Sequence, residues 1–231
     1  MSTTVSKAIC LHAQADDLQF LNPVRKRMGK LLVGSFQGFS FGDQKSQAEA
    51  RLALEKAEGS FVVVLGHGGS EYVRGGEYVH RVTREIIEAK KFLTVQDAQV
   101  FRGKVVFCLS CDSNGLARAC LAAGAQTFVG FGAVPFNRYD PSGNRISDDE
   151  FEHHAQQLIA NAIKATIERF VTGRATLDEA VAFLRLWICQ TTVRFVRKFQ
   201  SLKQRHEIAA LLLRVKDGVR YHGEPDVRFL K

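Results

Sequence analysis

Short apolar runs bounded by glycine and polar residues recur along the first 131 residues of the chain. Such runs are typical of strands buried on both faces of a parallel sheet. The predicted strands are Ala8–Leu11, Leu31–Gly34, Phe61–Leu65, Val105–Leu109 and Thr127–Phe131. Helical patterns separate most of these strands, and the clearest of them are Gln44–Ala57 and Asn114–Ala123. Strands that alternate with helices favour a largely parallel sheet covered by helices on both faces.

Two segments break this alternation of strands and helices. Gly75 and Gly76 stand between two short β-prone pieces within Glu71–Val79, a pattern that predicts a hairpin. Gly132–Asp149 is a long polar segment that contains two prolines. Loops of this length in a compact domain are usually functional or disordered.

Residues 148–231 are predicted to form a helical C-terminal part of the same domain. Its two helices and its closing turn and strand are predicted at Asp148–Val171, Thr176–Arg214 and Val219–Phe229. Asp148 or Asp149 is the candidate N-cap of the first helix. Thr176 and Glu179 have the spacing of a capping box at the start of the second helix.

Length and composition favour one globular domain that spans residues 1–231. At roughly 100–200 residues per domain, 231 residues are short for two domains, and the 4 prolines mark no linker. A hydrophobic share of 45% and a charged share of 24% exclude a mainly disordered chain. No run approaches the ~18 apolar residues of a membrane helix, and the first residues do not resemble a secretory signal. We therefore expect a cytoplasmic protein without a membrane span.

The net charge of +8 is concentrated in the C-terminal part of the chain. Residues 1–150 contain 18 basic and 16 acidic side chains, whereas residues 151–231 contain 14 and 8. A basic segment can favour nucleic acid, anionic lipid or an acidic protein partner. We interpret it here as the solvated face of amphipathic helices, so nucleic acid is a less favoured partner.

Two reactive side chains stand at the carboxyl ends of predicted strands. His67 follows the strand Phe61–Leu65 and precedes Gly68, and Cys111 follows the strand Val105–Leu109. In an open α/β sheet, binding and catalytic sites are built in the crevice beyond the carboxyl ends of the strands. A thiol is mostly protonated at pH 7, so a nearby imidazole increases its reactivity. This placement predicts a cysteine nucleophile with a histidine base.

The other cysteines do not suggest chemistry. Five cysteines without regular spacing are predicted to be free thiols rather than a disulfide framework. Cys10, Cys108, Cys120 and Cys189 are interpreted as small hydrophobic residues. Cys108 and Cys111 form a single CxxC without a second pair, which is a poor zinc signal. We expect neither a metal nor a cofactor.

The segment Phe61–Phe136 resembles the caspase-like cysteine peptidases, especially their CHAT branch. The matching motifs there are Gly66-His67-Gly68, Ser110-Cys111-Asp112-Ser113 and Ala123-Gly124-Ala125. The later motifs of the branch are matched by Gly173-Arg174-Ala175 and by His222-Gly223-Glu224-Pro225-Asp226. The resemblance covers about the last three quarters of the chain, and the order of the motifs is more specific than any one of them.

The resemblance implies a caspase-like three-layer α/β/α sandwich with a mainly parallel sheet of about six strands. It also implies a cysteine endopeptidase, in which Cys111 attacks a peptide bond to form a thioester and His67 is the acid/base partner. The backbone N–H groups of Gly68 and Cys111 would form the oxyanion hole. A specific protein substrate and a separate activator or sensor protein are implied partners, as in bacterial defence or cell-death-like systems.

Several relatives in this family cut after Arg or Lys, which a carboxylate in the substrate pocket recognises. Asp112, beside the nucleophile, and Asp140, on the long polar segment, are the candidate substrate-binding residues here. A buried carboxylate in such a pocket is costly unless a cationic side chain fills it. Asp148, Asp149 and Glu150 are better explained as favourable charges at a helix N-terminus.

Two other functions are alternatives. One is a basic, non-catalytic scaffold or nucleic-acid-binding module on the same fold, whose binding would survive Cys111→Ala and fall steeply with salt. The other is a cysteine-dependent α/β-hydrolase esterase, because Gly66-His67-Gly68-Gly69 is similar to an esterase oxyanion loop. That fold needs a G-x-S-x-G elbow, which the residues around Cys111 do not fit well.

Overall fold

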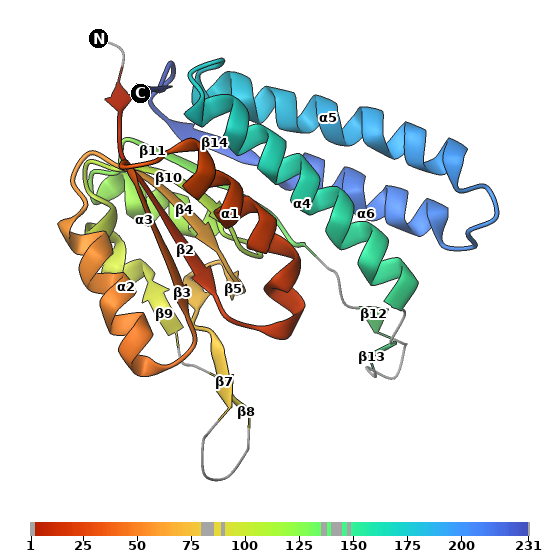
Figure 1. Ribbon diagram of the computed structural model, residues 1–231, viewed down its shortest axis with the longest axis horizontal. Coiled ribbons are helices and arrows are strands. Elements are labelled where there is room, and N and C mark those ends of the chain that lie inside the picture. The colour runs from red at the N-terminus through yellow and green to blue at the C-terminus, as the bar shows by residue number, and fades with distance from the viewer. Residues whose placement is uncertain are drawn as a thin grey trace.

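A six-stranded sheet forms the centre of the computed structural model (Figure 1). In spatial order its strands are β3 (Phe36–Phe41), β2 (Ala8–Ala13), β4 (Phe61–Leu65), β10 (Val105–Leu109), β11 (Thr127–Gly130) and β14 (Arg220–Gly223). The first five strands are parallel, and β14 runs antiparallel to β11 at the edge of the sheet. The structure describes residues 3–79, 86–88, 91–134, 138–139, 145–146 and 149–230, without the side chains of residues 78–79, 86–88, 138–139, 145–146 and 149.

Helices cover both faces of the sheet and make three layers. The helices α1 (Asn22–Leu31) and α4 (Asp149–Val171) pack together on one face. The other face is covered by α2 (Gln44–Lys56), the 3₁₀ helix η2 (Val95–Phe101) and α3 (Asn114–Ala122). Two more helices, α5 (Leu177–Lys198) and α6 (Arg205–Gly218), pack against each other and against α4, to one side of the sheet in Figure 1. The predicted α/β class and the mainly parallel six-stranded sheet are confirmed.

The remaining elements are short. They are β1 (Thr4–Val5), the 3₁₀ helix η1 (Asp16–Leu21), β5 (Gly68–Gly69), β6 (Tyr72–Arg74), β7 (Glu77–Val79), β8 (Ile86–Glu88), β9 (Lys91–Thr94), β12 (Arg138–Tyr139), β13 (Arg145–Ile146) and β15 (Arg228–Phe229). Among them, β5, β6 and β9 form a three-stranded sheet, β7 pairs with β8, and β1 pairs with β15. Among the described residues, no helix has the length and apolar character that crossing a membrane requires.

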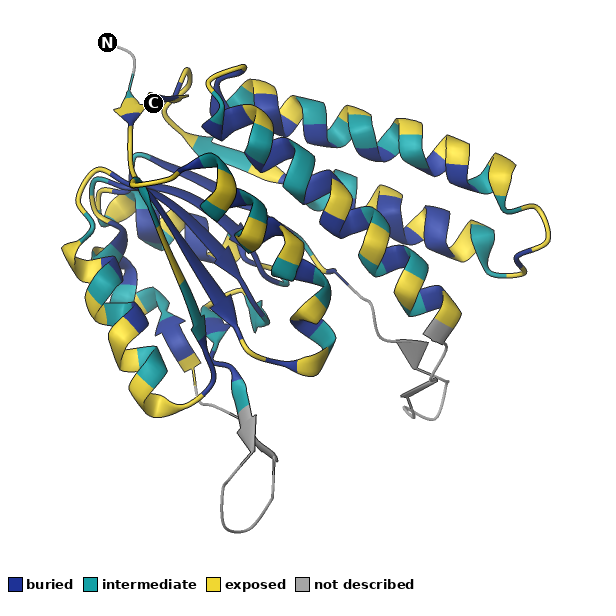
Figure 2. Ribbon diagram, viewed as in Figure 1, coloured by how far each residue is buried: buried dark blue, intermediate teal, exposed yellow. Residues whose placement is uncertain are grey.

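The central strands are apolar on both faces because helices cover both. All residues of β4 are 0% exposed, and those of β10 are at most 4% exposed. Figure 2 shows these strands in dark blue between helices whose outer faces are yellow. Aromatic rings connect the layers: Phe61 of β4 meets Phe170 of α4 edge to face, with ring centroids 4.8 Å apart. The continuous apolar runs in the sequence therefore predicted the central strands correctly.

The predicted strand Leu31–Gly34 is wrong. Leu31 is the last residue of α1, which has Pro23 in its first turn, and a turn follows it. The strand at the sheet edge is β3, whose residues are exposed or partly buried except for Phe41 at its end. Its apolar residues alternate with polar or small ones, so it lacks the continuous apolar run that marks a buried strand.

The predicted hairpin around Gly75-Gly76 is also wrong. The preceding strand β6 pairs with β5 and β9, whereas β7 pairs with β8. Gly76 lies too close to neighbouring backbone for a side chain. A Cβ there would lie 2.1 Å from the Phe41 carbonyl oxygen and 2.7 Å from the Gln14 nitrogen. The glycine lets the chain pass close to the ends of β2 and β3.

The segment predicted as one helix at Thr176–Arg214 is two helices. Helix α5 ends at Lys198, and a turn separates it from α6 without the glycine or proline that usually marks such a break. The predicted capping box is confirmed, because the Glu179 carboxylate accepts from the Thr176 N–H at 2.8 Å. The predicted closing segment holds two strands, β14 and β15, rather than one.

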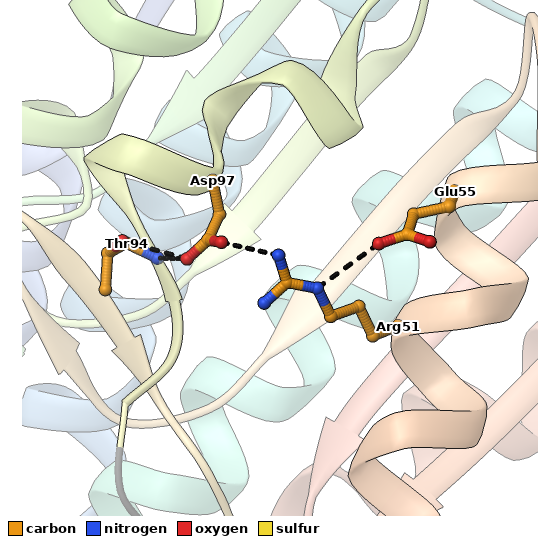
Figure 3. A network of polar contacts seen from close by, with 4 residues as sticks. All are labelled: Arg51, Glu55, Thr94 and Asp97. Atoms are coloured by element: carbon orange, nitrogen blue, oxygen red, sulfur yellow. Dashed lines mark hydrogen bonds and ion pairs between the residues drawn. The ribbon is translucent and has the colours of Figure 1, made fainter.

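A polar network ties α2 to η2 on one face of the sheet (Figure 3). Arg51 of α2 makes ion pairs with Glu55 at 3.2 Å and with Asp97 of η2 at 2.5 Å. The other oxygen of Asp97 accepts hydrogen bonds from the Thr94 N–H at 2.9 Å and the Thr94 hydroxyl at 2.8 Å. Burial favours a higher pKa for Asp97, but the hydrogen bonds from Thr94 and Arg51 outweigh it and lower that pKa.

Candidate active site

The order of the strands brings three chain segments together at one edge of the sheet. From β2 the chain first moves outward to β3 and then returns past β2 to β4, from which it proceeds to β10. The direction of winding thus reverses between β2 and β4, and ligands of open α/β sheets bind at such a point, beyond the carboxyl ends of the strands. Asp17 follows β2, His67 follows β4 and Cys111 follows β10.

Register places His67 and Cys111 at equivalent positions beyond two neighbouring strands. The last paired residues of β4 and β10 are Leu65 and Leu109. One residue further, the Gly66 N–H donates to the Leu109 carbonyl oxygen at 3.1 Å. His67 and Cys111 are each two residues beyond the Leu65–Leu109 pair. Because neighbouring strands are about 4.8 Å apart, both residues leave the sheet at adjacent points.

Two glycines hold the loops of these residues against each other. A Cβ on Gly68 would lie 2.2 Å from the hydroxyl oxygen of Ser110, the residue before Cys111. A Cβ on Gly115, in the first turn of α3, would lie 2.2 Å from the Ser70 carbonyl oxygen. Both contacts are closer than any side chain larger than hydrogen permits. Glycine at these positions therefore lets the histidine loop pack directly on the cysteine turn.

A buried serine fixes the turn that carries Cys111. The Ser113 hydroxyl donates to the Cys108 carbonyl oxygen at 2.8 Å and accepts from the Phe131 N–H at 2.9 Å. Ser113 is 0% exposed, so both bonds are shielded from water. The Asp112 N–H donates to the Gly132 carbonyl oxygen at 3.1 Å. The turn is thus bonded to the end of β11 at two successive positions.

Asp17 is the partner of His67. Its Oδ1 atom lies 2.9 Å from Nε2 of the imidazole, and both side chains are about one third exposed. A carboxylate accepts only, so Nε2 is the protonated nitrogen in the neutral ring, and Nδ1 keeps a lone pair. That lone pair is what a general base needs to take a proton from a thiol.

The Cys111 thiol is protonated in this arrangement. It donates to the Val134 carbonyl oxygen at an S–O distance of 3.7 Å. Burial raises the pKa of the thiol, and the nearby carboxylates of Asp112 and Asp17 raise it further. The influence of Asp17 shows that one carboxylate acts on both candidate residues. A neutral thiol must give its proton to a base when sulfur attacks.

The two expected oxyanion-hole donors, the N–H groups of Gly68 and Cys111, differ in their surroundings. The Arg74 N–H donates to the His67 carbonyl oxygen at 2.8 Å, which makes Gly68 and Val73 a non-hydrogen-bonded pair. The Gly68 N–H therefore points away from β6. The Cys111 N–H is directed at its own sulfur and acts on the thiol. Both N–H groups thus remain candidates for the predicted role.

The two candidate substrate-binding residues differ in placement. Asp112 is exposed and has a left-handed backbone with a φ of 53°, a conformation that Asp adopts more readily than most residues. It is not part of a buried pocket for a cationic side chain. Asp140 lies outside the described residues, as do the candidate helix cap Asp148 and most of the long polar segment.

The other cysteines lie apart from this chemistry. Cys10, Cys108 and Cys120 are buried, and burial raises the pKa of Cys10 and of Cys120 to about 12. Cys189 is half-buried on α5. No disulfide joins any of the five, as predicted from their spacing. Among the described residues, no group of three or more His, Cys, Asp or Glu side chains has an arrangement that could hold a metal ion.

Asp17 is the one member of the site that the sequence pattern did not single out. Its signal is of the same kind as that of His67 and Cys111, because a polar pair, Asp16-Asp17, follows a buried strand. The predicted strand ended at Leu11, two residues before the observed end of β2, so this pair was not placed at a strand end.

The fold and the site together define an α/β protein with a cysteine, a histidine and an aspartate at the carboxyl edge of a mainly parallel sheet. No model of a known protein family matches the chain, and no curated protein matches it.

Proposed function

We propose that this protein is a cysteine endopeptidase, in which Cys111 is the nucleophile and His67 its general base. The observation that carries the proposal is the placement of the two residues at equivalent points beyond adjacent parallel strands, with Asp17 bonded to the far nitrogen of the imidazole. The motif order that resembles caspase-like peptidases of the CHAT branch supports it independently. On this basis we also propose a caspase-like fold.

The proposed reaction proceeds in two steps. The Cys111 proton moves to Nδ1 of His67 as sulfur attacks the carbonyl carbon of a peptide bond. The imidazolium then gives that proton to the leaving amine as the C–N bond breaks, and a thioester remains on Cys111. Water, deprotonated by His67, hydrolyses the thioester and restores the thiol. Asp17 would orient the ring and stabilise the imidazolium, and the N–H groups of Gly68 and Cys111 would stabilise the oxyanion.

Peptidyl acyloxymethyl ketones with a basic or an acidic P1 residue test the proposal. We expect covalent labelling at Cys111 in the wild type, none in Cys111→Ala, and at least about 100-fold slower labelling in His67→Ala, since a general base contributes 10²–10⁴-fold. The half-buried thiol of Cys189 is the internal reference for a thiol without a histidine partner.

Labelling of Cys111 that is no faster than that of Cys189, or that does not depend on His67, would contradict the peptidase proposal. The preferred probe would report the charge of the substrate pocket. Because Asp112 is exposed, Asp140 is the proposed recognition residue there. A specific protein substrate and a separate activator remain proposals that follow from the same resemblance.

The charge of α5 and α6 favours a second candidate function, a binding module. Residues 177–218, which form α5, α6 and the turn between them, contain eight basic and four acidic side chains, half of the net charge of the chain. A basic surface of this density attracts nucleic acid or an acidic protein. In that case, binding to a DNA oligonucleotide would survive Cys111→Ala and weaken strongly between low and physiological salt. Binding that is absent at low salt would exclude the nucleic-acid version of this function.

A further inference from the structure

A pocket of about 570 Å³ opens at the carboxyl ends of β2 and β3. Its lining includes His12 of β2, Ser40 of β3 and Arg25 of α1. The strand order β10, β4, β2, β3 separates this pocket from Cys111 by at least two strand spacings, or about 10 Å. The pocket is therefore distinct from the point where the proposed nucleophile leaves the sheet.

Small residues on β3 make room for Arg25 between α1 and the sheet. Cys10 and His12 lie on the same face of β2, and their register partners on β3 are Gly38 and Ser40. A Cβ on Gly38 would already lie 3.6 Å from Cγ of Arg25, so a larger residue would displace the arginine side chain. The guanidinium thus runs along the sheet face toward His12.

Arg25 is a cation without an anionic partner among the residues that the structure describes. Its Nε is buried and makes no hydrogen bond, and no described carboxylate forms an ion pair with it. Cys10 does not supply the missing charge, since burial raises the pKa of its thiol to about 12, although Arg25 lowers it somewhat. Asp16 and Glu77 also line the pocket, but neither forms an ion pair with Arg25. An unpaired, partly buried cation is costly.

His12, which also lines the pocket, has a buried ring nitrogen without a hydrogen-bond partner among the described residues. The side chain is 3% exposed, and its Nε2 lies 3.2 Å from the Leu18 carbonyl oxygen. A carbonyl only accepts, so Nε2 carries hydrogen, and Nδ1 is buried without a hydrogen-bond partner in the described structure. Burial lowers the pKa of His12, and the charge of Arg25 lowers it further. The lowered pKa favours the neutral imidazole.

We propose that this pocket binds a carboxylate between the Arg25 guanidinium and the His12 imidazole. The planar guanidinium matches a carboxylate in shape and charge, and it supplies hydrogen-bond donors that have no acceptor without the ligand. The pocket has room for an acidic amino-acid residue together with the chain that carries it. This inference does not depend on the proposed peptidase function.

Carboxylate binding is coupled to protonation of His12. A carboxylate cannot donate to the lone pair on Nδ1, but an imidazolium donates to the carboxylate from that atom. The charged and titratable groups around His12 are Arg25 and Lys26 of α1, Asp16 of η1, Glu77 of β7 and the thiol of Cys10. A bound anion raises the pKa of His12, so the complex takes up a proton and binding tightens as the pH falls through that raised pKa.

The test uses Cys111→Ala protein, so that ligand binding is measured without any reaction at the thiol. The probe is acetyl-glutamyl-amide, and the matched control is the isosteric acetyl-glutaminyl-amide, which has no charge. NMR titration gives both affinities, and the long-range ¹H–¹⁵N spectrum of His12 reports the protonation of Nδ1 directly. We expect the glutamyl probe to bind at least about tenfold more tightly and to protonate Nδ1.

Variants separate the proposed contacts from general effects on folding. Arg25→Gln should weaken the glutamyl probe by about tenfold or more, and Arg25→Lys by less, because it keeps the charge. Ser40→Ala, at a neutral position in the lining, should change the affinity by less than about twofold. Thermal unfolding shows that each variant is folded before its affinity is interpreted.

Three results would overturn the proposal. Equal binding of the two probes would show that charge is not recognised. Unchanged binding by folded Arg25→Gln would remove the guanidinium from the site. Tighter binding of inorganic phosphate than of the glutamyl probe would replace the carboxylate with a phosphate as the ligand. A neutral His12 in the saturated complex would overturn the coupling to protonation.

Discussion

At the scale of single residues, the carboxylates around Cys111 have separable effects. Asp112 and Asp17 both raise the pKa of the thiol, but only Asp17 is hydrogen-bonded to His67. Loss of either charge should therefore make the free thiol more acidic. Loss of Asp17 should in addition release the imidazole from its orientation.

Asp112→Asn and Asp17→Asn form a matched pair for this distinction. We expect both to shift the pH–rate profile of iodoacetamide alkylation at Cys111 toward lower pH, since each removes a negative charge that raises the pKa. Asn adopts the left-handed backbone of position 112 readily, so the turn is retained.

Peptidyl-probe labelling should separate the two variants. Asp17→Asn should label about 10-fold to 1,000-fold more slowly than wild type, whereas Asp112→Asn should stay within about threefold. Equal labelling rates in the two variants would show that Asp17 acts on the thiol only through its charge and does not position His67.

The residues of the site differ in how far the linear sequence reveals them. His67 and Cys111 each follow a continuous apolar run, so their place at a strand end is visible without a structure. Asp17 lies near these two residues only because β2 is next to β4 in the sheet. In the chain, β3 comes between those two strands. Strand order is a property of the tertiary structure, and residues 14–17 alone do not contain it.

At the scale of secondary-structure elements, the packing of the β5–β6 turn on α3 is a testable part of the site. Gly115→Ala would place a Cβ 2.2 Å from the Ser70 carbonyl oxygen, which is backbone and cannot rotate away. We expect a loss of about 1–3 kcal/mol of unfolding free energy, and slower probe labelling because the histidine loop moves away from Cys111.

Gly29→Ala is the control, because the position of Gly29 has room for a methyl group. Gly29 lies inside α1, and a Cβ there would meet the Phe36 ring at 3.4 Å, close to ordinary contact. Alanine should stabilise the helix by about 0.5–1 kcal/mol and leave labelling unchanged. Thermal unfolding of both variants would measure the expected loss of stability in Gly115→Ala and the expected gain in Gly29→Ala. A loss of stability in Gly29→Ala would contradict this prediction.

The Arg51–Asp97 network predicts a pH dependence for the layer that contains α2 and η2. The pKa of Asp97 is lowered in the folded protein, so its contribution is fully present above the unfolded pKa of about 4. It is lost as the pH falls through the lower, folded pKa. The difference in thermal midpoint between wild type and Asp97→Ala should therefore shrink below about pH 4.

Arg51→Met distinguishes the contribution of the ion pair to stability from that of the helix cap in this network. It removes the contact with Asp97 but keeps the hydrogen bonds between Asp97 and Thr94. Asp97→Ala should consequently destabilise more, by about 1 kcal/mol, which is typical of a lost cap. A larger effect of Arg51→Met would mean that the ion pair dominates.

The elements that were predicted wrongly share a physical cause. β3 is an edge strand whose partly buried side chains do not produce an apolar run, and Gly75-Gly76 serves a close approach between segments rather than a turn. The break between α5 and α6 has no glycine or proline, so nothing local marks it. Helix caps, by contrast, depend on residues three positions apart, and the one at Thr176 was predicted correctly.

At the scale of the whole molecule, charge and chemistry are segregated. The candidate site lies at the carboxyl edge of the sheet, whereas half of the net positive charge lies on α5, α6 and the turn between them, to one side of the sheet (Figure 1). The C-terminal end of α6 meets the start of α3 just after Cys111, where the Asn114 side-chain amide donates to the Gly218 carbonyl oxygen at 2.8 Å. A partner bound near the turn between α5 and α6 would contact a surface other than the one that carries Cys111. This separation allows the peptidase and binding proposals to be tested in the same protein with independent variants.

The pairing of β1 with β15 determines where a tag joined to either terminus lies on the molecule. Thr4 and Val5 lie beside Arg228 and Phe229, at the amino end of the strands, and Figure 1 shows the two ends of the chain close together there. Cys111 and His67 leave the sheet at its opposite end. An affinity tag, a fluorescent fusion or a surface tether at either terminus would be attached at the amino end of the strands. The candidate site, at the carboxyl end, would then face solution.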